Sequence, residues 1–323
     1  MSNSAEVLKE VLKYLEVRKG SYVSGSELAE VLGVSRSTVN KYVLRLKDLG
    51  YVIESHPKFG YRLVNADDLS LANAYLRDLR TDISFKVVYV RRCDSTQDVA
   101  EQLASQGVEE GLVVVAEELT SGRGRLGRRW VANEGGLYFT VVLRPRYVRG
   151  LQLLSFAAGV AVAEALKGLH NVDVKLKWPN DVLLNEKKVA GILIEAKAEA
   201  DKVRYVLLGV GVNVNNELPE DLRETAITLK EFLGKSVDRV PILRGFLKNL
   251  DTLYKHLRAG EYDKVIKSWK GLSTTLGRYV KAVTVDGKEI LGRAVDVDLN
   301  GSLIIESSVG RVKLEAGDVY HLR

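Results

Sequence analysis

The sequence of 323 residues predicts an α+β fold made of three structural domains. Hydrophobic residues recur at helical spacing near the start of the chain. Strand-like and helix-like runs alternate from 85 to 272, and short strand-like runs with Asp-Gly and Asn-Gly turns follow from 279 to 322. We therefore expect a first domain at 1–64, a linker at 65–82, a second domain at 83–274 and a third at 275–323.

The composition limits the possible function classes. The 48 basic and 42 acidic residues give a net charge of +6, which permits a nucleic acid or a nucleotide as partner without requiring either. The single cysteine, Cys93, cannot form an internal disulfide, which fits a cytoplasmic location. The start of the chain does not have the pattern of a signal peptide, and no uninterrupted apolar run has the length needed to cross a bilayer. We expect no membrane association.

The first domain has the pattern of a helix-turn-helix. Ser24 and Glu27 have the spacing of a capping box, so a short helix is expected to begin there. Gly33 ends this helix, and Ser35 can cap the next one, which extends to about residue 49. A short helix, a tight turn with glycine and a second helix are typical of DNA-binding units.

The second helix of such a unit enters the major groove through its first turns. Arg36 can pair with guanine or phosphate, and Asn40 can pair with adenine. A hairpin expected at 51–64 would form a wing, with Lys58 placed to touch the DNA backbone. The expected DNA-binding residues are Ser35, Arg36, Ser37, Thr38, Asn40, Lys41 and Lys58. The alternative is a winged helix used for protein contact.

A glycine- and arginine-rich stretch, Gly-Arg-Gly-Arg-Leu-Gly-Arg-Arg-Trp at 122–130, is expected to be a ligand-binding loop. Glycine lets the backbone approach a ligand closely, and arginine offers a planar fork suited to carboxylate and phosphate oxygens. Strands expected at 112–116 and 137–143 would hold both ends of the loop. The alternative is a solvated loop or a nucleic-acid-binding tail.

A second stretch, Lys-Trp-Pro-Asn-Asp at 177–181, is expected to follow a strand and to place polar groups at its end. Asp181 could hold Mg²⁺ through water or pair with an arginine, and we favour the metal. Lys188 directly precedes an expected strand at 189–196, which would put its ammonium at the mouth of that strand. Gly-Val-Gly-Val-Asn at 209–213 lacks the third glycine of a dinucleotide-binding turn.

The arginine-rich loop, the Lys-Trp-Pro-Asn-Asp segment and the Lys-Val-Ala-Gly-Ile-Leu strand at 188–193 together resemble the motifs of the biotin–protein ligase family. The first domain also resembles the amino-terminal repressor domain of bifunctional members, with Gly25, Leu28, Leu32 and Gly33 at the matching positions. The resemblance implies a winged helix-turn-helix, a central mixed-sheet domain of the class II synthetase type and a small SH3-like β-barrel.

The resemblance implies an ATP- and Mg²⁺-dependent reaction that forms biotinyl-5′-AMP and transfers biotin to a lysine of a biotin carboxyl carrier protein. It also implies a homodimer that represses biotin genes by binding operator DNA. Two alternatives remain: a lipoate–protein ligase, and a ligand-sensing DNA-binding regulator with little turnover. A lipoate ligase is not expected to carry these motifs together.

The resemblance also assigns roles to individual residues. The biotin-binding residues would be Ser95, Thr96, Gln97, Gly122, Arg123, Gly124, Arg125, Lys188 and Gly191. The nucleotide-binding residues would be Arg125, Arg128, Trp130, Lys177, Asn180 and Asn213. Lys188, Arg123 and Arg125 would be catalytic, and Asp181 the metal ligand. The chain departs from the family pattern at Gln97, which is usually Asn, and at Leu119, which is usually Gln.

Overall fold

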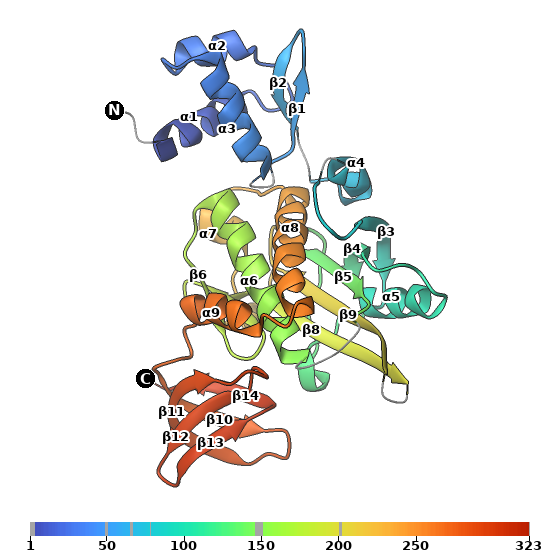
Figure 1. The fold of residues 1–323 in the computed structure, drawn as a ribbon, viewed down its shortest axis with the longest axis vertical. Coiled ribbons are helices and arrows are strands. Elements are labelled where there is room, and N and C mark those ends of the chain that lie inside the picture. The colour runs from blue at the N-terminus through green and yellow to red at the C-terminus, as the bar shows by residue number, and fades with distance from the viewer. Residues whose placement is uncertain are drawn as a thin grey trace.

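The computed structural model describes residues 4–48, 51–64, 67–77, 79–145, 151–199 and 202–322. Figure 1 shows the helices of the first domain at one end of the molecule, a mixed sheet with its helices in the middle, and a small β-structure at the other end. The predicted α+β class and the order of the three parts are confirmed.

The first domain consists of three helices and a two-stranded hairpin. Its elements are α1 (Ser4–Val17), α2 (Gly25–Val31), α3 (Arg36–Asp48), β1 (Ile53–His56) and β2 (Gly60–Leu63). The cap of α2 is formed as predicted, because the backbone N–H of Glu27 donates to Ser24 Oγ at 3.0 Å. The Glu27 carboxylate does not complete a capping box; it accepts a hydrogen bond from the Tyr14 hydroxyl at 2.9 Å and thereby fixes α2 against α1.

The linker is partly helical and packs against the rest of the protein. It contains a 3-10 turn, η1 (Leu69–Leu71), and α4 (Ala72–Leu76). Leu69 and Leu76 are buried, whereas Leu71 is 48% exposed. Asn73 attaches the linker to the central sheet by pairing with both the N–H and the C=O of Val87. The predicted position Asn65 lies outside the described residues.

The central domain is built on a seven-stranded mixed sheet. Its strands are β3 (Lys86–Cys93), β4 (Leu112–Leu119), β5 (Leu137–Leu143), β6 (Val174–Lys177), β7 (Asp181–Leu184), β8 (Lys187–Glu199) and β9 (Lys202–Val212). Their order is β3-β4-β5-β9-β8-β7-β6. Strands β3 and β4 are parallel, and the other neighbours are antiparallel.

Helices cover both faces of this sheet (Figure 1). One face packs on α5 (Thr96–Ser105), through Ala100 and Ala104. The other face packs on α6 (Leu151–His170), which also contacts α8 (Arg239–Arg258) and α9 (Tyr262–Leu272). The remaining elements of this domain are η2 (Arg125–Gly127), η3 (Glu220–Leu222) and α7 (Leu229–Leu233).

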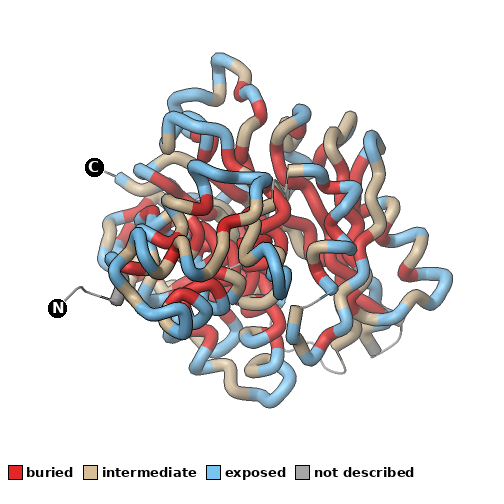
Figure 2. Tube along the Cα trace, turned by 90° about the horizontal axis from the view of Figure 1, so that it is seen from above, coloured by how far each residue is buried: buried red, intermediate tan, exposed pale blue. Residues whose placement is uncertain are grey.

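Helix α6 is the central helix of the hydrophobic core. It is the one described helix long and apolar enough to span a membrane by length and composition, but 78% of its most apolar stretch is buried inside the protein. Figure 2 shows the buried segments gathered in the middle of the molecule, with exposed segments around them. The stacked rings of Phe156 and Trp269, with centroids 4.2 Å apart, join α6 to α9.

The third domain is a five-stranded antiparallel sheet in the order β13-β12-β11-β10-β14. Its strands are β10 (Tyr279–Thr284), β11 (Glu289–Val297), β12 (Leu303–Ser307), β13 (Gly310–Leu314) and β14 (Gly317–His321). The predicted turns at Asp286-Gly287 and Asn300-Gly301 are confirmed. Gly317 and Asp318 pair with β10 and belong to β14.

The first and second domains meet at the end of α6. The Tyr51 hydroxyl donates to the carbonyl of Leu169, and the neighbouring His170 has a buried Nε2 for which the described residues offer no hydrogen-bond partner. Burial, followed by the positive charge of Lys235, lowers the pKa of His170 to about 4.

Because the pKa of His170 is lowered on folding, we expect the protein to lose stability in acid. The unfolded chain binds the His170 proton near pH 6.5 and the folded chain only near pH 4, so stability should fall as pH decreases through that window. The contribution of His170 is at most about 3 kcal/mol. We expect His170→Phe to flatten the fall between pH 7 and pH 4.5, measured by urea unfolding. Parallel pH curves for the variant and the wild type would contradict this expectation.

Candidate active site and DNA-binding surface

A cavity of about 190 Å³ lies between the sheet, the arginine-rich loop and the third domain. The start of α5, the end of β4, strands β8 and β9, the segment 177–181 and strand β14 all contribute side chains or backbone to its lining. Thirteen residues predicted to form the site line it: Ser95, Thr96, Gln97, Arg123, Gly124, Arg125, Arg128, Trp130, Lys177, Asn180, Asp181, Lys188 and Gly191.

The loop at 122–130 is held at both ends by strands β4 and β5, as the sequence predicts. Its stems are cross-linked by backbone hydrogen bonds, from Trp130 N to Gly122 O at 2.8 Å and from Gly124 N to Arg128 O at 2.7 Å. A Cβ on Gly122 would lie 2.5 Å from the Trp130 carbonyl oxygen. Glycine is therefore required at 122 for the loop to close on itself.

Trp130 points from the loop onto the floor of the cavity. A Cβ on Gly191 would lie 3.0 Å from the Trp130 ring, and a Cβ on Gly211 would lie 2.6 Å from it. These two glycines pair with each other across β8 and β9, so they form a flat floor on which the indole rests. Strand β9 continues to Val212, so Gly211 belongs to the strand.

The start of α5 presents polar groups to the same cavity. Ser95 caps the helix by accepting from Gln97 N at 3.2 Å, and Thr96 accepts from the Thr140 hydroxyl at 2.8 Å. Gln97 is buried, and its Nε2 donates to Leu193 O at 3.4 Å. Within the described part of the chain, Gln97 Oε1 and Trp130 Nε1 are buried without a partner. Buried unpaired polar atoms in a cavity wall favour a polar ligand.

Lys188 is the cation closest to the floor of the cavity. Its Nζ lies 2.5 Å from Asp181 Oδ1 and 5.3 Å from the centre of the Trp130 ring. It lies inside β8, which begins at Lys187, and not just before the strand as predicted. The reason is that β7 and β8 form a tight hairpin in which Leu183 pairs directly with Lys188.

The cavity is strongly electropositive. Six basic residues line it, Arg123, Arg125, Arg128, Arg129, Lys177 and Lys188, against the two carboxylates Asp181 and Asp318. Burial lowers the pKa of Arg125. Burial, assisted by the nearby Lys188 charge, also lowers the pKa of Lys177. Bound anions would compensate these partly desolvated charges.

Arg123 has a different environment from the other loop arginines. Its Nη1 and Nη2 bind the two oxygens of Asp98 at 2.9 and 2.7 Å, and Nη2 lies 3.5 Å from Glu195 Oε2. This bidentate ion pair attaches the loop to α5 at the edge of the cavity. The Arg123 guanidinium is thus engaged by carboxylates, whereas Arg125 contacts only the amide oxygen of Asn180, at 3.4 Å, among the hydrogen bonds of the described residues.

Two predicted residues do not line the cavity. Gly122 is buried at the base of the loop, where its carbonyl accepts from Trp130 N. Asn213 is also buried, and its side chain donates to Lys188 O at 3.5 Å and accepts from Asn216 Nδ2 at 3.3 Å. Asn213 therefore supports the backbone of Lys188 from behind, and it does not face the cavity in this structure.

The cavity also contains residues that the sequence analysis missed. The third domain contributes Asp318 and Tyr320 from β14: Asp318 pairs with Arg128, and the Tyr320 ring lies 5.9 Å from Lys177 Nζ. Buried Trp178 donates from Nε1 to Gly301 O at 3.0 Å and so joins the cavity to the third domain. The Trp-Pro pair at 178–179 was a local signal for a fixed turn, but no pattern in the sequence indicated the contribution of β14.

The residues present do not form a metal centre of their own. No group of three or more His, Cys, Asp or Glu side chains with metal-binding geometry occurs among residues that the structure describes. The Asp181 carboxylate is engaged by Lys188, and the Asp318 carboxylate by Arg128. Mg²⁺ commonly binds proteins through one or two carboxylates together with substrate phosphates.

The predicted DNA-binding residues lie together on the first domain. Ser35, Arg36, Ser37, Asn40 and Lys41 are exposed at the start of α3, and Thr38 is half-buried. The Ser35 hydroxyl caps the helix by accepting from Thr38 N at 3.1 Å.

The wing contacts this helix directly. The Tyr61 hydroxyl of β2 donates to Asn40 Oδ1 at 3.2 Å, which holds the amide at the surface. Lys58 is exposed at the tip of the wing, with its Nζ 5.7 Å from the centre of the Phe59 ring.

The fold and the cationic cavity define a protein–cofactor ligase with an added DNA-binding domain, and comparisons with known proteins agree. The model of the family described as "Biotin/lipoate A/B protein ligase family" matches residues 89–213. The model of an HTH domain matches residues 7–62, and that of the biotin protein ligase C-terminal domain matches residues 275–322. This chain belongs to the biotin/lipoate A/B protein ligase family.

Individual relatives resemble nearly the whole chain. The bifunctional ligase/repressor BirA of Bacillus subtilis is 31% identical over 318 residues, which cover 96% of this chain and 97% of the relative. BirA of Escherichia coli is 30% identical over 311 residues, or 94% of each chain. The structure of the Aquifex aeolicus biotin protein ligase with biotin and ATP has a TM-score of 0.65 and 33% identity, covering 74% of this chain and 99% of that chain.

Proposed function

We propose that this protein is an ATP-dependent biotin–protein ligase that is also a DNA-binding transcriptional repressor. The observation that carries the ligase proposal is the cationic cavity closed by the 122–130 loop, with Lys188 between Asp181 and the Trp130 ring. The similarity to BirA along nearly the entire chain supports both activities. We propose that 1–64 binds DNA, 65–82 is the linker, 83–274 is the catalytic domain and 275–323 is the C-terminal domain.

In the first step, the carboxylate of biotin attacks the α-phosphate of ATP, and pyrophosphate leaves. In this proposal Lys188 contacts both the carboxylate and the α-phosphate, and the position of its ammonium in the cavity beside Asp181 supports the role. Arg125, Arg128 and Lys177 neutralise the phosphates, and Asn180 orients Arg125. Each charge-assisted hydrogen bond contributes about 1.5–3 kcal/mol. Ser95, Thr96 and Gln97 bind the ureido ring of biotin.

Mg²⁺ enters as part of the substrate, bound to the phosphates of ATP, and Asp181 is the candidate ligand that would hold it through water.

In the second step, the ε-amine of a lysine on a biotin carboxyl carrier protein attacks the acyl carbon of biotinyl-5′-AMP. An amide bond forms and AMP leaves. The closed loop keeps water from the mixed anhydride until the acceptor arrives.

Biotin-dependent ATP–pyrophosphate exchange tests the first step, and labelling of a carrier protein tests the second. We expect both with biotin and neither with lipoate. Exchange with lipoate instead would indicate a lipoate ligase. Binding of biotin without exchange or transfer would indicate a ligand-sensing regulator.

The repressor proposal rests on the exposed polar start of α3 beside the β1–β2 wing. The protein is proposed to act in the cytoplasm as a homodimer, in which two winged helices bind the two halves of an operator. Biotinyl-5′-AMP accumulates when acceptor protein is scarce and then favours operator binding.

We expect Arg36→Ala to weaken binding of DNA selected from a random-sequence pool by the full-length protein with biotin and ATP. An arginine at a base edge contributes about 1–3 kcal/mol, so the affinity should fall roughly 5- to 150-fold. Arg45→Ala is the matched control, because Arg45 is exposed on the same helix but in its last turn. Equal losses for both variants, measured by gel shift, would contradict a specific role for Arg36.

A further inference from the structure

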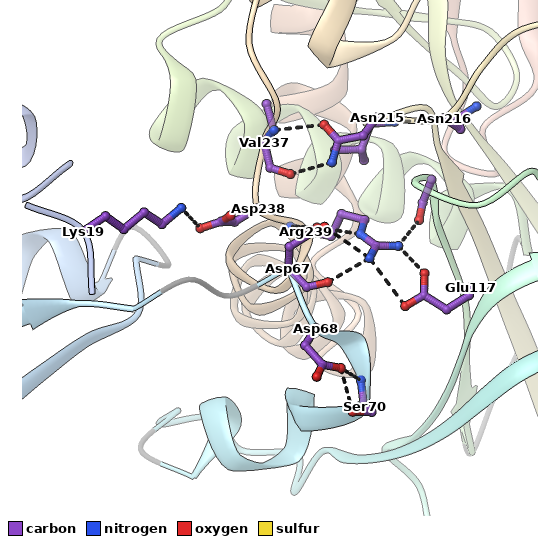
Figure 3. Close-up of polar contacts among 12 residues, drawn as sticks. Lys19, Asp67, Asp68, Ser70, Glu117, Asn215, Asn216, Val237, Asp238 and Arg239 are labelled. Atoms are coloured by element: carbon purple, nitrogen blue, oxygen red, sulfur yellow. Dashed lines mark hydrogen bonds and ion pairs between the residues drawn. The ribbon is translucent and has the colours of Figure 1, made fainter. Parts of the chain in front are cut away.

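A buried arginine connects the linker to the catalytic loop. Helix α8 begins with Arg239, whose side chain is only 6% exposed. A guanidinium has five N–H donors in a fixed plane, and Figure 3 shows that those of Arg239 are directed at surrounding acceptors. Nε donates to Asp67 Oδ1 at 2.6 Å. Nη1 donates to Glu117 Oε2 at 2.6 Å and to Gly136 O at 3.1 Å. Nη2 donates to Asp67 O at 2.8 Å and to Glu117 Oε1 at 3.4 Å.

These acceptors belong to three separate segments. Glu117 lies on β4, two residues before the strand ends and the arginine-rich loop region begins. Gly136 directly precedes β5, which receives the other end of that region. Asp67 belongs to the linker that joins the winged helix to the catalytic domain. The Arg239 side chain therefore joins the linker to both strand ends that flank the arginine-rich loop.

The residues just before Arg239 make parallel connections (Figure 3). Asp238 pairs with Lys19 of the first domain, with Oδ2 and Nζ 2.5 Å apart. The amide of Asn215 binds both the N–H and the C=O of Val237, at 2.9 and 2.8 Å. Asn215 N in turn donates to Gly135 O at 2.8 Å, in the turn before β5. The start of α8 is thus anchored to the first domain on one side and to the loop stem on the other.

We propose that Arg239 is a positioning residue that couples two changes: closure of the arginine-rich loop at 122–130 and ordering of the linker at Asp67. This inference rests on the proposed function. When the loop closes over biotinyl-5′-AMP, β4 and the turn before β5 are fixed, and Arg239 then fixes Asp67. Because the guanidinium is buried, water cannot readily replace a lost partner, so the contacts form and break together. Such coupling acts in both directions, so fixing Asp67 of the linker also favours the closed form of the 122–130 loop.

Asp67 is the best position for a test. Its side chain is 41% exposed, so truncation does not leave a cavity in the core. Its neighbour Asp68 provides a matched control, because among the hydrogen bonds of the described residues the Asp68 carboxylate accepts only from Ser70, at 2.9 Å from N and 2.6 Å from Oγ. Figure 3 shows Asp67 directed at Arg239 and Asp68 directed at Ser70.

The experiment is hydrogen–deuterium exchange on the full-length protein with and without biotin and Mg·ATP. In the wild type and in Asp68→Ala, ligands should slow exchange in both 122–130 and 67–77. In Asp67→Ala, ligands should still protect 122–130 but not 67–77. Pyrophosphate exchange should show a rise in KM for biotin of roughly 2- to 30-fold with kcat unchanged, the range of coupling through such networks.

A purely structural role for Asp67 would lower stability and leave the ligand response of the linker intact, and that result would overturn the inference. Protection of 122–130 alone in the wild type would overturn it as well, while leaving the proposed ligase function in place. Failure of ligands to protect either segment in the wild type would overturn both. Asp67→Asn, which removes the charge and keeps the shape, replaces Asp67→Ala if that variant does not fold.

Discussion

Lys188→Ala should lower kcat/KM for biotin-dependent pyrophosphate exchange by about 100- to 1,000-fold, the effect of removing one preorganised electrostatic contact from a transition state. The substitution removes the cation nearest the cavity floor and leaves the Asp181 carboxylate without its 2.5 Å partner, so the site becomes less positive where two anions must meet. Exchange of radiolabelled pyrophosphate into ATP measures the effect directly.

Lys187→Ala is the control for this prediction. Lys187 precedes Lys188 on the same strand, but its Nζ donates to Arg223 O at 2.7 Å outside the cavity lining. The control variant should exchange at the wild-type rate. If Lys188→Ala also exchanged at that rate, while both variants melted like the wild type, Lys188 would have no part in the chemistry.

Gly211→Ala should lower kcat/KM by roughly 100-fold, because displacing a positioning group by about 1 Å can have an effect of this size. The added methyl would lie 2.6 Å from Cε2 and 2.7 Å from Nε1 of Trp130, so the rigid indole must leave its floor. Trp130 N is bonded to Gly122 O, so displacement of the indole disturbs closure of the loop.

Gly271→Ala is the matched control, because a Cβ at this exposed position in α9 meets no atom within 4 Å. It should exchange like the wild type. Binding of biotin and of ATP should be measured separately by calorimetry, since the Trp130 ring is proposed to contact the nucleotide. Wild-type affinity for both ligands in Gly211→Ala would show that the indole is free to move without consequence.

Most elements of the fold could be predicted because their signals are local. Strand β5 occurs at the predicted residues, since apolar residues defined it and glycine and proline bounded it. The glycine-rich end of β9 gave no strand signal, because glycine carries no side chain and therefore shows no periodicity. Only the indole of Trp130, folded onto Gly211 from a distant segment, explains why glycine is needed within a strand.

The site was predictable to the extent that its residues occur in motifs. Lys177, Asn180 and Asp181 are close in sequence and do line the cavity. The carboxylates that engage Arg123 come from α5 and β8, and no local pattern could show that Asp98 and Glu195 converge on one guanidinium. The role of buried Arg239 was also invisible, because its partners are far away in the sequence.

The contribution of β14 to the cavity has a consequence for biosynthesis. Asp318, Val319 and Tyr320 are translated after every other residue of the cavity lining. A nascent chain that lacks them has no third-domain wall to its pocket, so the binding chamber is incomplete until the ribosome has synthesised β14. Chains that terminate before β14 lack that wall.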